Sequence, residues 1–113
     1  MSWDIMLAKP RPGVDPDLFD ELGEEDLELF DIAKAKSALE KEYPQIKELE
    51  PTWLVFTVDE CFGIEMNLNE DCIMLHVHIL DESYEEQILT MIQNMSKILH
   101  CRAYDTEEGE FLA

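Results

Sequence analysis

Three short segments of alternating apolar and polar residues lie in the middle of the chain and constrain the fold more than any other feature. They span residues 53–58, 62–68 and 73–80, separated by joints of three and four residues. Because successive side chains of a strand point to opposite faces of a sheet, a period of two predicts strands with one buried face. Joints this short connect neighbouring antiparallel strands, so the segments predict a three-stranded meander.

The register of this meander follows from the requirement that all apolar sets lie on one face. The second joint pairs Leu68 with Ile73, Met66 with Leu75, Ile64 with Val77, and Phe62 with Ile79. The first joint pairs Val58 with Phe62, Phe56 with Ile64, and Leu54 with Met66. Both joints therefore predict the same buried face.

Segments on either side of the meander complete a predicted α+β fold. Residues 3–8 alternate as a strand, and residues 25–43 carry apolar residues at helical spacing. A capping-box pattern at 83–86 opens a second predicted helix near 84–97, whose apolar stripe is Tyr84, Ile88, Met91, Ile92 and Met95. Residues 99–104 form a last predicted strand, with Cys101 and Ala103 facing inward. The order is β-α-β-β-β-α-β, which predicts a single two-layer domain with a mainly antiparallel sheet and two helices on one face.

The chain is strongly acidic, with 27 Asp and Glu residues against 8 Lys and Arg and a formal net charge of −19 at pH 7. Nucleic acids and anionic membranes are bound through Lys and Arg, so we expect neither as a direct partner. The length fits one domain, residues 1–113, with an acidic loop and helix start at 10–31. The N-terminus lacks signal-peptide features and no stretch is long enough for a membrane span, so we expect a cytoplasmic protein.

The sequence contains no recognisable catalytic motif. The patterns GxGxxG, HExxH, GxSxG and the phosphate-binding P-loop are absent. Cys101 adjoins His100 in the sequence, but neighbouring residues of a strand point to opposite faces, so we do not expect them to act as a nucleophile and its base. The three cysteines, Cys61, Cys72 and Cys101, lack zinc-type spacing, and we expect reduced packing residues. We therefore expect neither enzymatic activity nor a cofactor.

The polar face of the meander is the first candidate site. The predicted register places Val55, Glu65 and His76 in one row across the sheet, with Trp53 and His78 beside them. Two histidines with a carboxylate can bind a metal, so one alternative is a metal-binding protein or metal-dependent enzyme that uses Glu65, His76 and His78. The interpretation we favour is that Glu65 hydrogen-bonds His76 as an ordinary cross-strand pair. Trp53, Glu65, His76 and His78 are then candidate partner-binding residues and not metal ligands.

The second candidate site is an acidic run at residues 15–31, where nine of seventeen residues are Asp or Glu and none is basic. One interpretation is a solvated helix start that keeps the protein soluble. The other is an anionic surface that steers and docks a basic partner. Its candidate partner-binding residues are Asp20, Glu24, Glu25 and Glu28.

Five segments of the chain carry a distinctive combination of residues: 1–6, 51–53, 63–68, 73–77 and 102–111. In combination they resemble a family of small, uncharacterised bacterial proteins that are suspected to be immunity-type proteins of contact or polymorphic toxin systems. The resemblance brings no catalytic motif with it. It implies a role in binding and neutralising a protein partner.

The charge, the absence of catalytic motifs and this resemblance predict a non-enzymatic acidic binding module. Its expected partner is a basic protein, such as a toxin or a nucleic-acid-processing protein. A further alternative is a structural subunit that forms a homo-oligomer through the open sheet face or a sheet edge. The sequence leaves the oligomeric state open.

Overall fold

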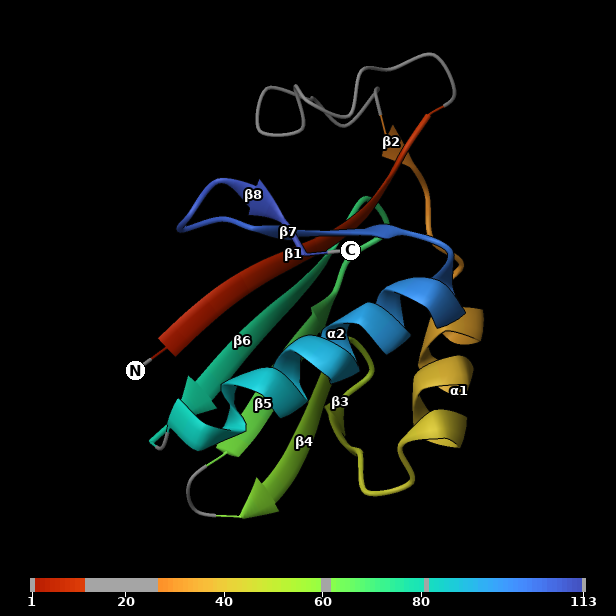
Figure 1. The fold of residues 1–113 in the computed structure, drawn as a ribbon. Coiled ribbons are helices and arrows are strands. Elements are labelled where there is room, and N and C mark those ends of the chain that lie inside the picture. The colour runs from red at the N-terminus through yellow and green to blue at the C-terminus, as the bar shows by residue number, and fades with distance from the viewer. Residues whose placement is uncertain (1, 12–26, 60–61, 81, 113) are drawn as a thin grey trace.

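The computed structural model describes residues 2–11, 27–59, 62–80 and 82–112. Within these residues the chain forms an antiparallel sheet of eight strands and two helices, which confirms the predicted α+β class (Figure 1). The strands are β1 (Ser2–Pro10), β2 (Leu27–Glu28), β3 (Lys47–Glu50), β4 (Trp53–Asp59), β5 (Phe62–Leu68), β6 (Ile73–Ile79), β7 (Arg102–Asp105) and β8 (Glu110–Phe111). The helices are α1 (Ile32–Glu42) and α2 (Glu85–Leu99), and a 3-10 turn (Glu82–Tyr84) precedes α2. Neither described helix has the length and apolar content of a membrane span.

The first strand of the chain lies inside the sheet. The strand order is β3-β4-β5-β6-β1-β7-β8, and β2 pairs with β1 outside this path. Thus β1 joins the meander of β4, β5 and β6 to the C-terminal strands. Both helices cover the same face of the sheet (Figure 1). Neither described helix lies over the opposite face.

The predicted register of the meander is confirmed except at one pair. β5 and β6 pair Leu68 with Ile73 and continue in step to Phe62 and Ile79, and β4 pairs Leu54 with Met66 and Phe56 with Ile64. At the end of β4, however, Asp59 and not Val58 lies opposite Phe62. A register shift between Thr57 and Asp59 adds one residue to β4 there, as in a β-bulge.

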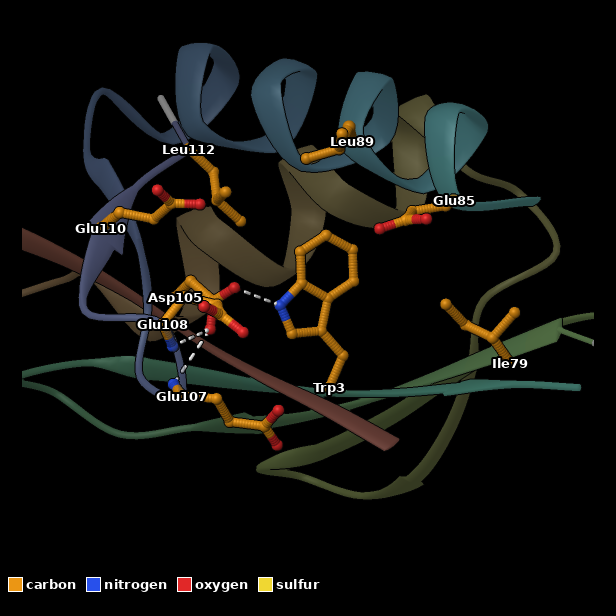
Figure 2. A pocket seen from close by; sticks show the side chains of 9 residues that line it. All are labelled: Trp3, Ile79, Glu85, Leu89, Asp105, Glu107, Glu108, Glu110 and Leu112. Atoms are coloured by element: carbon orange, nitrogen blue, oxygen red, sulfur yellow. Dashed lines mark hydrogen bonds between the residues drawn. The ribbon is translucent and has the colours of Figure 1, made fainter. Parts of the chain in front are cut away.

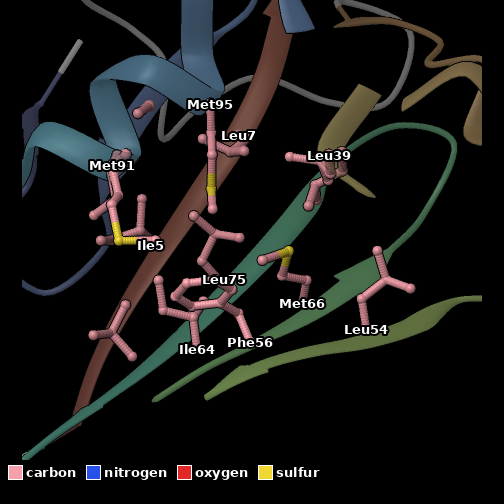
Figure 3. Close-up of a cluster of buried hydrophobic side chains, with 14 of the residues drawn as sticks. Ile5, Leu7, Leu39, Leu54, Phe56, Ile64, Met66, Leu75, Met91 and Met95 are labelled. Atoms are coloured by element: carbon pink, nitrogen blue, oxygen red, sulfur yellow. The ribbon is translucent and has the colours of Figure 1, made fainter. Parts of the chain in front are cut away.

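The main hydrophobic core fills the space between the sheet and the helices (Figure 3). Side chains with no exposed surface come from the sheet and from both helices: Ile5, Leu7, Leu54, Ile64, Met66, Leu75, Leu39, Ile92 and Met95. The meander residues in this core belong to the apolar set that strand parity predicts to be buried. The apolar stripe predicted on the second helix is also confirmed, since Ile88, Met91, Ile92 and Met95 are buried.

A smaller apolar cluster covers one end of the opposite face. Ala8, Leu27 and Tyr104 are its buried members, and Met6 and Phe111 pack against them. Leu27 reaches this cluster because β2 pairs with the end of β1. The open face is therefore apolar and covered at this end, while its other end is polar.

The first predicted helix begins later than expected. The sequence analysis started it near residue 25, whereas α1 begins at Ile32 and Leu27–Glu28 form a strand. Asp31 precedes the helix in an extended conformation, and its side chain accepts a hydrogen bond of 3.2 Å from the Lys34 amide. This N-cap satisfies a free amide of the first turn. Leu29 lies before the helix and is 61% exposed, so it does not belong to the buried face of α1.

The ends of the second helix also differ from the prediction. Ser83 lies in the 3-10 turn and Tyr84 is the residue before α2, so the predicted capping box does not begin this helix. At the other end α2 continues to Leu99, and His100 ends it with a left-handed φ of 54°. The last predicted strand therefore starts only at Arg102. Of the two residues expected to face inward, Ala103 is fully buried, whereas Cys101 lies before the strand and is only half-buried.

Candidate functional site

The sheet face away from the helices carries a row of side chains across four strands. Val55, Glu65, His76 and Asp4 are successive partners in the registers of β4, β5, β6 and β1. The first three form the row that strand parity predicts. Asp4 extends the row, and the sequence analysis missed it because its pairing joins residues 72 positions apart.

His76 in this row and His78 beside it contact different carboxylates. His76 Nδ1 lies 2.8 Å from Asp4 Oδ1, and His78 Nε2 lies 3.6 Å from Glu65 Oε2. The expected hydrogen bond between Glu65 and His76 is therefore wrong. Asp4 lies directly opposite His76 and meets its ring, whereas the longer Glu65 side chain extends to the diagonal neighbour His78.

These side chains surround a shallow hollow of about 460 Å³ on the polar face. Its described lining residues are Asp4, Trp53, Glu65, Asn67, His76 and His78, so these supply carboxylates and an indole but no Lys or Arg. We call this surface the sheet-face hollow. Among the described residues no three His, Cys, Asp or Glu side chains converge as metal ligands. Glu65, His76 and His78 thus do not form the ligand group considered as an alternative from the sequence.

The acidic run contributes one described residue to the candidate set. Asp20, Glu24 and Glu25 lie outside the described residues. Glu28 is exposed on β2, where it pairs with Lys9. Lys9 is five residues from Asp4 along β1, which corresponds to about 17 Å of extended chain. Glu28 therefore lies at a distance from the sheet-face hollow and does not line it.

A second cavity lies on the helix side of the sheet, beside the start of β1 (Figure 2). It has a volume of about 340 Å³, and we call it the Trp3 cavity. Its lining residues are Trp3, Ile79, Glu85, Leu89, Asp105, Glu107, Glu108, Glu110 and Leu112. Figure 2 shows the Trp3 indole among side chains from α2 and from the turn after β7. The sequence analysis did not predict this cavity, although the parity of the first strand does direct Trp3 toward the helices.

Asp105 holds the indole and the neighbouring turn in place. Only 2% of this residue is exposed. Its Oδ2 accepts a hydrogen bond of 2.6 Å from Trp3 Nε1, and its Oδ1 accepts bonds of 2.9 and 3.2 Å from the amides of Glu107 and Glu108. The bond to Trp3 joins residues 102 positions apart, so only the fold brings the walls of the cavity together.

The two described cysteines lie outside both surfaces and are free thiols. Burial raises the pKa of Cys101 to about 11, with a smaller opposing effect from its contact with Ser96. Burial also raises the pKa of Cys72, and the adjacent Asp71 adds to that rise. Both thiols are therefore protonated at neutral pH, which is the opposite of an activated nucleophile.

The comparisons with known proteins do not add a relative. No family model matches the sequence, and no curated protein or solved structure shows significant similarity to it. Any function assigned to the sheet-face hollow and the Trp3 cavity therefore rests on the geometry and charge of the chain itself.

Proposed function

We propose that this protein is a non-enzymatic acidic binding module that docks a basic protein partner and blocks its activity, as an immunity-type protein blocks a toxin. The sheet-face hollow is the observation that supports this most directly. Its lining includes the half-buried Trp53 and the carboxylates of Asp4 and Glu65, on a sheet face that no described helix covers. This combination suits Lys or Arg side chains of a partner.

The energetics of such an interface divide between its centre and its edges. Trp is among the residues that most often dominate binding energy, because an indole buries a large area at little cost in side-chain entropy. The net charge of −19 acts at longer range and favours encounter with a basic partner. Trp53 is therefore expected to control dissociation, and the acidic residues are expected to control association.

A site-specific cross-linking experiment tests this proposal. A photo-reactive benzoylphenylalanine replaces Trp53 in one variant and Glu40, an exposed residue of α1, in the matched control. We expect the first variant to cross-link one basic protein in cells of the source organism, and the control to cross-link it far less. The captured protein is then purified and its activity measured with and without the acidic chain.

Three results would contradict the proposal. They are equal cross-linking from both positions, a captured protein that is acidic, and a captured protein whose activity the chain leaves unchanged. Light scattering of the purified chain completes the test, since a stable homo-oligomer that buries Trp53 would make this surface a subunit interface. For a partner that passes, Trp53→Ala should weaken binding by about 2 kcal/mol or more, mainly through faster dissociation.

A further inference from the structure

The walls of the Trp3 cavity are apolar where they meet the body of the protein. Trp3 borders it together with Ile79 at the end of β6, Leu89 of α2, and Leu112 near the C-terminus. The hydrogen bond from Trp3 Nε1 to Asp105 fixes the orientation of the indole. A group that enters the cavity therefore meets a preformed aromatic and aliphatic surface.

The mouth of the same cavity is acidic. Glu85, Glu107, Glu108 and Glu110 line it and are exposed, and no Lys, Arg or His is among the described residues of its lining. Within the described part of the chain, none of these four side chains takes part in an ion pair. The cavity thus places uncompensated carboxylates around an apolar, aromatic interior.

This arrangement fits one kind of occupant. An anion would be repelled, and an apolar group would cover the carboxylates without pairing them. An arginine side chain satisfies both parts, since its guanidinium stacks on indole and donates hydrogen bonds to carboxylates while its methylene stem covers apolar surface. At about 340 Å³ the cavity is at the small end of ligand pockets, which suits one side chain better than a whole structural element.

From these features we infer that the Trp3 cavity is a receptor for a single arginine side chain of the partner protein. The inference rests on the proposed function in that it takes the occupant to come from a protein. Trp3 and the adjacent Asp4 point to opposite faces of β1, so the Trp3 cavity is separate from the sheet-face hollow. The cavity would therefore be a second anchor for the partner. The partner then contacts the protein at the Trp3 cavity as well as at the sheet-face hollow.

A small probe tests the cavity without the partner. Nα-acetyl-L-arginine N-methylamide is titrated into the ¹⁵N-labelled protein at 0.15 M salt, and the indole N–H signals of Trp3 and Trp53 are followed by NMR. The neutral citrulline analogue, which has nearly the same shape, is titrated in parallel. We expect a saturable shift of the Trp3 signal with the arginine probe, and an affinity for citrulline at least about tenfold weaker because the charge-assisted contacts are lost.

Two variants with equal loss of charge show where the probe binds. The cavity variant carries Glu107→Gln, Glu108→Gln and Glu110→Gln, and the control variant carries Glu40→Gln, Glu50→Gln and Glu70→Gln, all at exposed positions. We expect the cavity variant to bind the arginine probe about fivefold more weakly or worse. The control should change affinity less than about twofold, since charges beyond a Debye length of about 8 Å are screened. Matching urea midpoints would show that both variants are folded.

The outcomes separate this inference from the proposed function. Equal binding of the citrulline analogue, equal loss in both variants, or a shift at Trp53 without one at Trp3 would overturn the arginine site and leave the sheet-face proposal standing. A saturable, charge-dependent shift at Trp3 supports the arginine site even if cross-linking from Trp53 captures no basic protein.

Discussion

Removal of the Asp105 side chain is the sharpest test of how the Trp3 cavity is built. Asp105→Ala deletes the acceptor for three donors, namely Trp3 Nε1 and the amides of Glu107 and Glu108. The two turn amides belong to exposed residues and can be rehydrated, whereas Trp3 is half-buried. The bond from the indole to the carboxylate therefore decides most of the effect.

The expected magnitude follows from the kind of hydrogen bond. Bonds to charged groups contribute about 1.5–3 kcal/mol, and a donor left without a partner costs about 1–3 kcal/mol. Only 2% of Asp105 is exposed, so its carboxylate has lost most of its hydration, and this cost offsets part of the stabilisation from its hydrogen bonds. We expect Asp105→Ala to lower the free energy of unfolding by about 2–4 kcal/mol, a large fraction of the total of about 5–15 kcal/mol for a domain.

A double-mutant cycle isolates the contact itself. Trp3→Phe removes the donor and part of the ring, Asp105→Ala removes the acceptor, and the double variant removes both. Urea unfolding is followed by far-UV circular dichroism, because Trp3 is one of two fluorescent indoles and is itself replaced. We expect a coupling energy of about 1.5–3 kcal/mol between the two sites. A coupling energy below about 0.5 kcal/mol would refute the assignment of this hydrogen bond as the contact that holds the cavity wall.

Four other predictions concern the core, the helix end, a thiol and the acidic run. Val77→Asp should unfold the protein, as judged by circular dichroism, because Val77 has no exposed surface and an unpaired buried charge costs several kcal/mol; a folded variant would refute the burial. His100→Gly should raise stability by about 0.5–1 kcal/mol in urea unfolding, since φ at His100 is 54°, and an unchanged midpoint would contradict a strained cap. The pKa of Cys101 is raised to about 11 from an ordinary 9.0, so the thiol contributes its full share to the free energy of unfolding below pH 9, and this share is lost as pH rises toward 11. In Cys101→Ala, the free energy of unfolding should therefore fall less steeply between pH 9 and 11. Neutralising the acidic candidates Asp20, Glu24, Glu25 and Glu28 should slow association with a basic partner and flatten the salt dependence of that rate, while leaving dissociation nearly unchanged. Stopped-flow kinetics that show no change would mean that the acidic run is only a solvated segment.

The sequence by itself determined the meander and the side of it that is buried. Alternation in three neighbouring segments leaves few registers, because a shift by one residue would move a whole apolar set to the solvent face. The pairs Leu68–Ile73 and Phe56–Ile64, and the row of Val55, Glu65 and His76, follow from this local rule and are present in the structure. The apolar stripe of the second helix followed from its period in the same way.

Only the tertiary structure decided which distant segments meet. The insertion of β1 between β6 and β7 places Asp4 beside His76 and draws Glu65 toward His78. The pairing of Leu27 with Pro10 replaces the expected first turns of helix with a short strand. The Trp3 cavity brings Trp3 of β1 together with Ile79 of β6, with α2 and with residues 105–112. Periodicity describes which face of an element is buried, but the choice of neighbour is set by non-local packing, which no short window of sequence contains.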